Sequence, residues 1–393
     1  MLNDTDGLRV GVAVRRISFG DGIGGMERAA GDHVKGLVER GVAVTLFVPR
    51  AAIDGEAPAA VEVVDVPWPD WLGPRTPLAA SYPLWVRRLA SAIDAAPNQL
   101  DVLHVHGGTA GVLRPGLLGG ASTIPSVANP HGMEEFNATT PLRTLGRLVL
   151  RRLARQAKHA TRVVATDTVL IDVVRQHLDV TDTQIVVIPN AVDIDRLRGL
   201  VDRAALSDGF TVVSLGRLVT NKGYDLLLEA LRDEAVRAEL PQGWSWAHYG
   251  SGAEDASLLA AAARPPAVPL DIRSGRSDAE VQTAVAAADV FVQPSRYEGS
   301  SLTTLEAMAH GVVVVGTAVG GIPDKIQDGV TGFLATQASA ADLADAILRA
   351  LASSEDVGVA AAHLVEERFS STSASASYRD LYLSLARTDE ERP

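Results

Sequence analysis

Arg217 and Lys222 are the two side chains whose types and spacing most clearly suggest chemistry. They follow the apolar segment 211–215, a predicted strand, and precede a predicted helix that begins at Tyr224. A guanidinium is a planar, two-pronged donor and an ammonium is a point charge, so together they could hold one diphosphate. Each cation would attract a phosphate charge by about 4 kcal/mol at 4 Å and an effective dielectric constant of 20. The alternative is an ordinary solvated pair on the surface.

Glu298 and Glu306 follow another predicted strand, 290–293. Glu298 falls in a loop of Gly and Ser, where a carboxylate can accept hydrogen bonds from vicinal hydroxyls such as those of a sugar. Glu306 has a structural alternative, because Thr303-x-x-Glu306 matches a capping box. Backbone N–H groups at the predicted helix start offer an anion nest. They belong to Ser300, Ser301, Leu302 and Thr303.

A glycine loop precedes the first predicted helix. Residues 20–25 match the dinucleotide pattern G-x-G-x-x-G, but five residues, 15–19, separate it from the first predicted strand. The second strand ends in Arg50 rather than in the acidic residue of the dinucleotide fingerprint. An NAD(P) site is therefore a weak alternative. Gly24 and Gly25 would let bare backbone N–H groups approach an anion at the helix start, or would form a flexible turn without a ligand.

Predicted strands and helices alternate along almost the whole chain. The predicted strands are 10–14, 42–48, 102–105, 163–165 and 185–188 in the first half, and 211–215, 245–249, 270–273, 290–293 and 312–315 in the second. Amphipathic stretches of helical length lie between them, which implies parallel sheets built from right-handed βαβ units. The predicted fold class is α/β, with two doubly wound, Rossmann-like domains that face one another across a cleft. Ligands of such sheets bind at the carboxyl ends of the strands.

A charged stretch without strand character, 193–208, separates the two series. We therefore expect one domain over residues 1–197 and a second over 198–371. A Ser-rich link precedes a last predicted helix at about 372–393, which we expect to pack back on the first domain.

Composition narrows the class of protein further. The chain has 393 residues, of which 47% are hydrophobic and 21% charged, and a formal net charge of −12. The absence of cysteine excludes a disulfide framework, a thiolate nucleophile and any cysteine metal site. The negative charge argues against a broad nucleic-acid-binding surface. An acidic start and the lack of an apolar run of about 18–20 residues lead us to expect a soluble, cytoplasmic protein.

Three histidines and one acidic pair are further candidates. His104 and His106 point to the same side of a strand end, as metal ligands do, but no third ligand at zinc spacing follows, so packing or pocket lining is favoured. His131, between a proline and a glycine, can project from its loop. Asp193 and Asp195 form a D-x-D string in the linker, which we interpret as a surface turn.

The segment 142–162 is basic within an acidic chain. Its Arg and Lys side chains recur at near-helical spacing, and leucines gather on the opposite side. One interpretation is a helix with a solvated basic face. The other is attraction to anionic lipid headgroups or to an acidic acceptor.

The pattern Gly-Arg-x₄-Lys-Gly, followed about 75 residues later by Glu-Gly-x₆-Glu-Ala-Met-Ala-x-Gly, resembles the retaining nucleotide-sugar glycosyltransferases of family 4. The resemblance extends over most of the chain and implies the two-Rossmann GT-B fold. Its further matching segments are Gly24–Glu27, Asp101–His106, Asn129–Gly132, Pro189–Asp193 and Gly320–Gly332.

The resemblance implies roles for five residues. Arg217 and Lys222 would hold the donor diphosphate, and Glu306 would hold the nucleotide ribose. Glu298 would hold hydroxyls of the transferred sugar, with His131 beside the reacting centre. All of these except Glu306 would be the catalytic residues.

The other donor-binding residues that the resemblance implies are Gly24, Gly25, Gly275, Arg276, Ser300, Ser301, Leu302 and Thr303. Gly275 and Arg276 fall where the family's backbone contacts the nucleobase. The family commonly has Phe-Gly where this chain has Ser300-Ser301, so the nest or the donor sugar is expected to differ.

We therefore predict a retaining, metal-independent hexosyltransferase that needs no cofactor. Its donor would be a UDP- or GDP-linked sugar bound by the second domain, and its acceptor a small molecule, lipid or glycan bound by the first. Nucleic acid is not an expected partner, whereas an anionic membrane could contact 142–162. The alternatives are a nucleotide-sugar epimerase of the same fold, an NAD(P)-dependent oxidoreductase and a non-catalytic nucleotide-sugar sensor.

Overall fold

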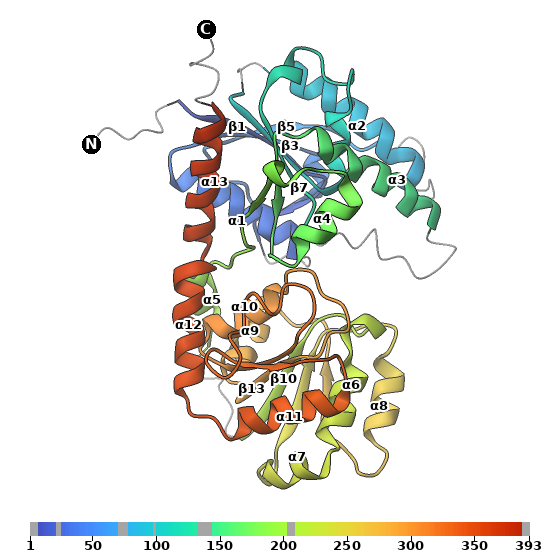
Figure 1. The fold of residues 1–393 in the computed structure, drawn as a ribbon, viewed down its shortest axis with the longest axis vertical. Coiled ribbons are helices and arrows are strands. Elements are labelled where there is room, and N and C mark those ends of the chain that lie inside the picture. Colours follow the sequence, from blue (N-terminus) through green and yellow to red (C-terminus); the bar gives the residue numbers. More distant parts are fainter. Residues whose placement is uncertain are drawn as a thin grey trace, which may run out of the picture. The chain divides into compact units, whose positions relative to one another are not determined.

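The computed structural model describes residues 7–20, 25–69, 78–96, 100–131, 144–202 and 209–386. The chain divides into two compact units, which are described one at a time (Figure 1). Unit 1 comprises Met1–Asn190 and Ser371–Pro393, and unit 2 comprises Ala191–Ser370. Each contains a parallel sheet with helices packed on it, so the predicted α/β class with two Rossmann-like domains is confirmed.

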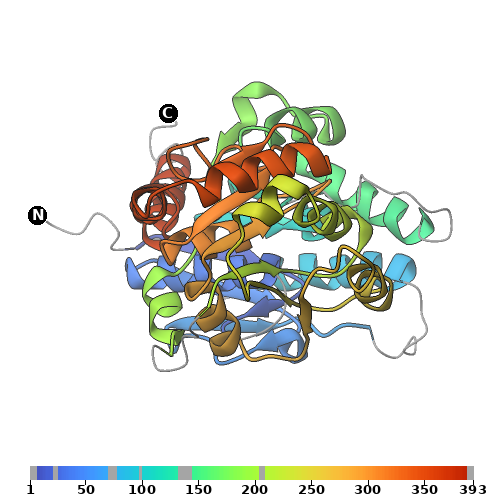
Figure 2. The same ribbon diagram turned by 90° about the horizontal axis from the view of Figure 1, so that it is seen from below.

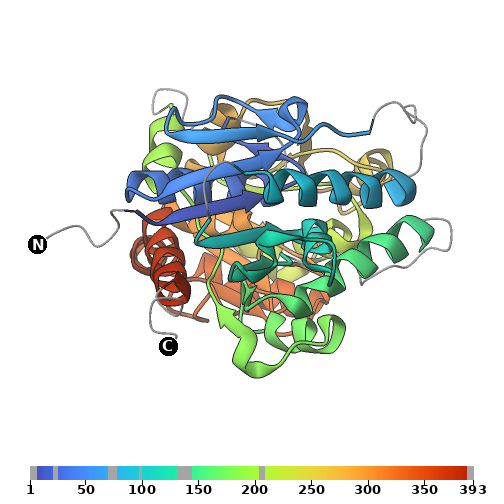
Figure 3. The same cartoon turned by 90° about the horizontal axis from the view of Figure 1, so that it is seen from above.

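Unit 1 is built on a seven-stranded sheet of order β5-β3-β1-β6-β7-β8-β9 (Figure 3). Its strands are β1 Arg9–Ala13, β3 Ala43–Val48, β5 Val61–Asp65, β6 Val102–His106, β7 Ser126–Asn129, β8 Arg162–Ala165 and β9 Ile185–Val187. Its helices are α1 Gly25–Glu39, α2 Leu78–Asp94, α3 Thr144–Ala154, α4 Leu170–Leu178 and α13 Ser371–Ala386. A short pair, β2 Ile17–Ser18 and β4 Ile53–Asp54, lies outside this sheet. Val10 and Val12 of β1 are fully buried, as expected of a parallel strand covered on both faces.

Unit 2 is built on a six-stranded sheet of order β12-β11-β10-β13-β14-β15 (Figure 2). Its strands are β10 Thr211–Leu215, β11 Ser245–Tyr249, β12 Leu270–Arg273, β13 Val290–Gln293, β14 Val313–Thr317 and β15 Phe333–Ala335. Its helices are α5 Ile194–Leu200, α6 Tyr224–Leu231, α7 Glu234–Glu239, α8 Asp255–Ala262, α9 Asp278–Ala286, α10 Leu302–Ala309, α11 Ala340–Leu351 and α12 Asp356–Arg368.

The strand order reverses at one place in each sheet. In unit 1 the chain winds outward from β1 to β3 and β5, and then returns to β6 on the other side of β1. In unit 2 it winds from β10 to β11 and β12, and returns to β13. Loops that follow the two strands flanking such a point diverge to opposite faces and leave a crevice at the carboxyl edge. In unit 2 these are the loops that carry Arg217, Lys222 and Glu298.

The expected domain boundary at 197/198 is corrected by the packing of α5. Ile194 and Leu197 of this helix are buried in the same hydrophobic cluster as Phe291 of β13. The helix therefore belongs to unit 2, and the division falls before it, after Asn190.

The last helix, α13, belongs to unit 1 although it is separated from the rest of that unit by the whole of unit 2. It packs closely on α1 (Figure 1), where a Cβ on Gly36 would lie 1.9 Å from Ser375 Oγ. Arg40 also donates to the carbonyl of Thr372 at 2.6 Å. Within the described ranges, no helix combines the length and the apolar character that crossing a bilayer requires.

Candidate active site

Lys222 and Glu298 form a buried ion pair at the switch point of unit 2. Lys222 Nζ lies 3.0 Å from Glu298 Oε1 and 2.8 Å from Oε2, and the two side chains are 17% and 11% exposed. Glu298 also accepts hydrogen bonds from Gln293 Nε2 at 3.3 Å and Ser295 Oγ at 3.0 Å. The carboxylate thus has partners for both oxygens before any ligand is bound, and this compensates for its burial.

Two glycines allow the loops of this ion pair to pack backbone against backbone. Gly223, next to Lys222, has φ +69, and a Cβ there would lie 2.0 Å from the carbonyl oxygen of Pro294. Gly320 has φ +54, and a Cβ there would lie 2.0 Å from the carbonyl oxygen of Glu298. Glycine is required at both positions by the positive φ and by the close approach.

Arg296 joins the same two loops by its side chain. Its guanidinium makes two bonds of 2.6 Å to the carboxylate of Asp225, and it donates to the carbonyl of Thr220 at 3.0 Å. Its backbone N–H donates to the carbonyl of Asn221 at 2.9 Å. The positions of Lys222 and Glu298 are therefore fixed by contacts on both sides of the pair.

Glu306 is held by side chains from another helix rather than by a cap. It is 3% exposed, and Gln282 Nε2 of α9 donates to its Oε2 at 3.2 Å. His310 Nε2 lies 2.9 Å from Gln282 Oε1. Burial, reinforced by repulsion from Arg198, lowers the pKa of His310 from 6.5 to about 4. The capping-box alternative is wrong, because α10 begins at Leu302 and Glu306 lies in its second turn.

The start of α10 has an unusual backbone. Ser301, which precedes the helix, has φ +35, a left-handed value that non-glycine residues rarely adopt. Thr303 Oγ1 donates to Gln293 Oε1 at 2.9 Å, whereas Ser300 Oγ is buried without a hydrogen-bond partner among the described residues. Leu302, the first helical residue, is partly buried. The expected anion nest thus directly follows the loop of Glu298.

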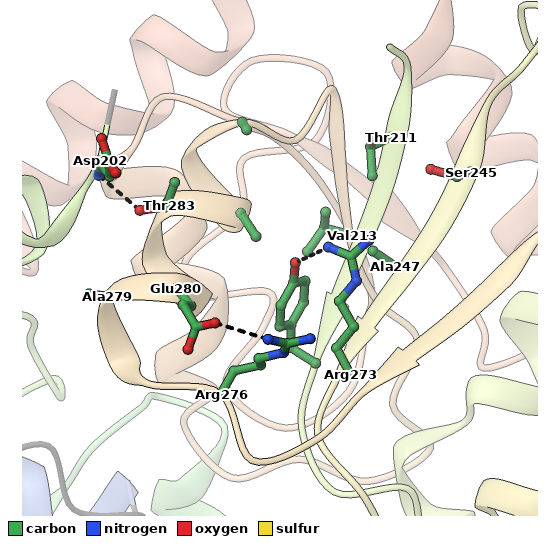
Figure 4. A pocket seen from close by; sticks show the side chains of 13 residues that line it. Asp202, Thr211, Val213, Ser245, Ala247, Arg273, Arg276, Ala279, Glu280 and Thr283 are labelled. Carbon is green, nitrogen blue, oxygen red and sulfur yellow. Dashed lines mark hydrogen bonds and ion pairs between the residues drawn. The ribbon is translucent and has the colours of Figure 1, made fainter. Parts of the chain in front are cut away.

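The other expected donor contacts lie along the same carboxyl edge. Arg217 is exposed just after β10, and Gly275, with φ +67, lies between β12 and α9. Arg276 makes a surface ion pair of 3.1 Å with Glu280. Beside them, a hollow of about 480 Å³ lies between α9 and strands β10 and β11 (Figure 4). Arg273 crosses this hollow and donates to Tyr249 Oη at 2.7 Å.

Unit 1 holds a cluster of four buried histidines at the carboxyl ends of β6 and β7, which we call the histidine cluster: His33, His104, His106 and His131. His106 Nδ1 lies 2.9 Å from His131 Nε2. Burial lowers the pKa of His131 from 6.5 to about 4, and burial with repulsion from His131 lowers that of His33 to about 3. The pKa values of the other two are also well below 6.5, chiefly through burial. All four rings are therefore neutral near pH 7.

His131 has a strained backbone that is held by its neighbours. Its φ is +56, and its N–H donates to Asn129 Oδ1 at 2.9 Å. Asn129 Nδ2 in turn donates to Tyr378 Oη of α13 at 3.1 Å. A second tyrosine of α13, Tyr382, places its hydroxyl 3.0 Å from His33 Nε2 and in hydrogen-bond contact with His104 Nδ1.

Potential metal-ligand atoms of His33, His104 and His106 lie within 4.8 Å of one another. The rings of His104 and His106 are stacked, however, with centroids 4.3 Å apart and planes inclined by 11°. An imidazole binds a metal through a lone pair in its ring plane, so two nearly parallel planes at this spacing do not meet at one ion. The arrangement is that of packed, neutral rings.

The glycine loop, the D-x-D string and the basic segment are the remaining features that the sequence singled out. Gly24 lies outside the described residues, and Gly25 is the first residue of α1. Asp193 of the D-x-D string caps α5 by accepting from the N–H of Arg196 at 3.0 Å. In the basic segment, Arg155 donates to the carbonyl of His177 in the last turn of α4 at 3.3 Å, and Lys158 pairs with the side chain of Asp179 at 3.3 Å.

Fold and site together define a class, the glycosyltransferases that are built from two Rossmann-like units. Residues 23–196 match the family model described as Glycosyltransferase Family 4, and residues 209–353 match the model described as Glycosyl transferases group 1. The chain belongs to the family 4 glycosyltransferases.

Relatives and solved structures agree with this assignment. A 144-residue segment is 35% identical to glycogen synthase of Pseudomonas aeruginosa and covers 36% of this chain and 26% of that protein. D-inositol 3-phosphate glycosyltransferase of Actinosynnema mirum is 31% identical over 278 residues, 64% of each chain. The chain thus aligns with less than two thirds of the length of these two relatives. Sucrose-phosphate synthase of Thermosynechococcus elongatus shares the fold, with TM-score 0.75 at 18% identity over 97% of this chain and 100% of that one.

Sequence reasoning missed the residues that hold the candidate catalytic groups. These are Asn129, Gln282, Gln293, Ser295, Tyr378 and Tyr382. A weak signal existed for Gln293, a polar residue that ends an otherwise apolar strand. Tyr378 and Tyr382 recur at helical spacing in the last helix, together with Leu381 and Leu385, and this spacing predicts packing but not that their hydroxyls reach the histidine cluster.

Proposed function

We propose that the protein transfers a hexosyl group from a UDP- or GDP-linked sugar to an acceptor hydroxyl, with retention of configuration and without a metal ion. The donor diphosphate binds Arg217 and Lys222, and Glu306 binds the nucleotide ribose. Unit 1 binds the acceptor near His131. Family membership supports the reaction class, and the ion pair of Lys222 with Glu298 is the observation that carries the assignment of the donor site.

Lys222 suits a diphosphate because its pairing with Glu298 compensates for the burial of the ammonium and fixes its position. An ammonium has three N–H donors, and Glu298 accepts on both oxygens, which leaves Lys222 able to donate to a phosphate from the same position. As the glycosidic C–O bond breaks, negative charge grows on the leaving diphosphate, and fixed cations stabilise it. Glu298 is then also placed to accept from a sugar hydroxyl.

Retention follows from attack on the same face of the sugar. The acceptor oxygen forms its bond to the anomeric carbon as the bond to the diphosphate breaks, and the leaving phosphate takes the acceptor proton. His131 supplies a neutral imidazole near the reacting centre, since burial keeps its pKa at about 4. A neutral ring can accept or donate a hydrogen bond without adding charge.

Metal independence is supported by the same cations. Lys222 and Arg217 provide charge of the kind that a divalent ion would otherwise bring to the diphosphate, and the stacked planes of the histidine cluster do not favour a metal.

We further propose that the basic segment 142–162 attracts an anionic acceptor or membrane surface. Two of its cations, Arg151 and Arg152, lie in the last turn of α3. Binding to vesicles that contain anionic lipid, lost when both are reversed to Glu, tests this; binding that is unchanged by the reversal contradicts it.

The main experiment is a panel of UDP-, GDP- and ADP-sugars scored by thermal stabilisation, because a bound donor raises the melting temperature by mass action. We expect one donor series to stabilise the wild type with EDTA present, and Lys222→Ala to abolish the effect. Lys158→Ala is the matched control, since it removes a surface lysine of unit 1. NMR of the product then gives the anomeric configuration. Stabilisation of Lys222→Ala equal to wild type would overturn the donor assignment, and an inverted product would overturn retention.

A further inference from the structure

We propose that α13 positions His131 through two hydroxyl groups, those of Tyr378 and Tyr382. The significance of His131 for the reaction rests on the proposed function, whereas the contacts themselves do not. A helix from the end of the chain would thereby control a side chain that lies some 250 positions earlier in the sequence.

The first route runs through the backbone. Asn129 Nδ2 donates to Tyr378 Oη at 3.1 Å, and Asn129 Oδ1 accepts from the N–H of His131 at 2.9 Å. An amide donates only through nitrogen and accepts only through oxygen. The backbone N–H of His131 can only donate and therefore faces Oδ1, and the hydroxyl of Tyr378 holds the opposite end of the same amide in place. That acceptor in turn supports the left-handed backbone of His131, with φ +56.

The second route runs through the imidazole rings. The hydroxyl of Tyr382 contacts His33 Nε2 and His104 Nδ1. A hydroxyl carries one proton, so where it donates to one ring it must accept from the other, and the tautomers of the two histidines are coupled. His104 stacks on His106 and fixes the plane of that ring.

His106 then meets His131 at the end of this route. The two facing nitrogens, His106 Nδ1 and His131 Nε2, lie 2.9 Å apart, and one of them must carry the proton. Since each ring is neutral, this choice also decides whether His131 Nδ1 is a donor or an acceptor. The backbone of His131 and the plane of the ring that faces it are therefore both set by contacts that α13 completes.

The atoms left over point to the same role. Each of the four histidines has one buried ring nitrogen without a hydrogen-bond partner among the described residues: His33 Nδ1, His104 Nε2, His106 Nε2 and His131 Nδ1. Buried polar atoms in native proteins are normally satisfied by protein, water or ligand. His131 thus uses one nitrogen for the network and keeps the other for a molecule that enters the site, which suits a hydroxyl of the acceptor.

The test uses the full-length chain with Tyr378→Phe, Tyr382→Phe and the double variant, each of which removes only hydroxyls. Ring nitrogens of His131, labelled with ¹⁵N and assigned with a His131→Gln variant, report its tautomer in the ligand-free protein. We expect each single variant to shift these signals and to lower kcat about tenfold, the usual effect of one lost hydrogen bond. The KM for the donor and donor-induced thermal stabilisation should not change, because the donor site has its own core in unit 2.

Two further variants separate positioning from loss of stability. Leu385→Ala removes buried packing from the same helix but keeps both hydroxyls, so we expect a lower melting temperature with unchanged His131 signals and kcat. Asn129→Ala should shift the His131 signals as Tyr378→Phe does, and combining the two should add little, because both break one chain of contacts.

The experiment can refute the positioning of His131 by α13 and the proposed function independently of each other. If the ring signals of His131 are the same in wild type and in both Tyr→Phe variants, positioning by α13 is refuted, whatever happens to activity. If Leu385→Ala lowers kcat as much as the Tyr→Phe variants, the effect belongs to stability and the inference is again overturned. If the signals shift but the wild type transfers no sugar from any donor, the positioning stands and the proposed function fails.

Discussion

The donor site of unit 2 and the histidine cluster of unit 1 bury polar side chains in two different ways. In unit 2 a buried carboxylate and a largely buried ammonium are paired with each other, and the carboxylate also accepts two further hydrogen bonds. In unit 1 four imidazoles are buried, and burial is the largest cause that drives their pKa values down. The donor site thus contains an ion pair, and the histidine cluster contains neutral hydrogen-bonding groups.

This difference indicates which kind of ligand group each site can bind. The ammonium of Lys222 is held in place by Glu298 and can donate to an anion from that position. Neutral imidazoles can orient a hydroxyl without attracting a counter-charge. They do so only at a pH above their pKa values. Removal of a charged side chain should therefore affect the donor site of unit 2 most. Low pH should destabilise unit 1 most.

The largest expected effect is that of Lys222→Ala. The change leaves Glu298 as a buried carboxylate without its cation, which typically costs about 3–5 kcal/mol, and it removes a charged contact to the diphosphate. We expect a hundredfold or greater fall in kcat/KM and a lower unfolding free energy, measured by steady-state kinetics and by denaturant titration. Lys158→Ala, which breaks an exposed pair, should cost under about 1 kcal/mol. Equal effects of the two variants would contradict the comparison.

The second effect is acid destabilisation concentrated in unit 1. Above pH 6.5, His131 is neutral in both folded and unfolded chains; below it, the unfolded chain takes up a proton that the folded site, with a pKa of about 4, refuses. Stability is thus lost as pH falls from 6.5 to 4, by about 1.4 kcal/mol per pH unit and about 3 kcal/mol in all for this residue. Hydrogen exchange of β6 against β13 between pH 8 and pH 4 measures it.

Unit 2 serves as the internal control for acid. Among its described residues, buried His248 and partly buried His310 have lowered pKa values, against the four buried histidines of the histidine cluster. Protection of β6 should therefore fall faster than that of β13, and His33→Gln should reduce the slope of β6. A parallel loss in both units would show that the cluster does not dominate the acid response.

The strands of unit 2 could be predicted almost residue by residue. Strands β10 to β13 coincide with their predicted bounds. β10, β11 and β13 are short and largely buried, and β12 is an alternating edge strand, Leu-Asp-Ile-Arg. Their order in an alternating pattern was enough to bring the loops of Lys222 and Glu298 to one edge, since parallel strands share their carboxyl ends. The fold and the neighbourhood of the site thus followed from local periodicity.

What could not be predicted depends on contacts between distant residues or on weak local patterns. β7 (Ser126–Asn129) is a short strand with polar ends, β5 (Val61–Asp65) is interrupted by Glu62, and α2 contains Pro83. The direct pairing of Lys222 with Glu298, rather than separate ligands for each, needs the close loop packing that Gly223 and Gly320 allow. The contact of Tyr382 with the histidine cluster joins positions that no local period relates.

A smaller effect is expected from Gln282→Met, which tests whether the nucleotide side of unit 2 also depends on buried partners. The change leaves Glu306 Oε2 and His310 Nε2 without the amide that now bridges them. An unsatisfied buried group costs about 1–3 kcal/mol. We expect a higher KM for the donor with little change in kcat, whereas Gln337→Met, at an exposed site of unit 2, should change neither. A fall in kcat alone would place Glu306 at the sugar rather than at the ribose.

The smallest effect is expected from Arg276→Ala. Its guanidinium pairs with Glu280 at the surface, with side-chain exposures of 49% and 51%, and such pairs contribute little to stability. If the base is contacted by backbone at this turn, as the family resemblance implies, UDP and GDP affinities should not change. Gly275→Ala would instead strain a residue with φ +67 and should weaken both nucleotides alike. A change in the ratio of UDP to GDP affinity in Arg276→Ala, measured by calorimetry, would show that the side chain itself selects the base.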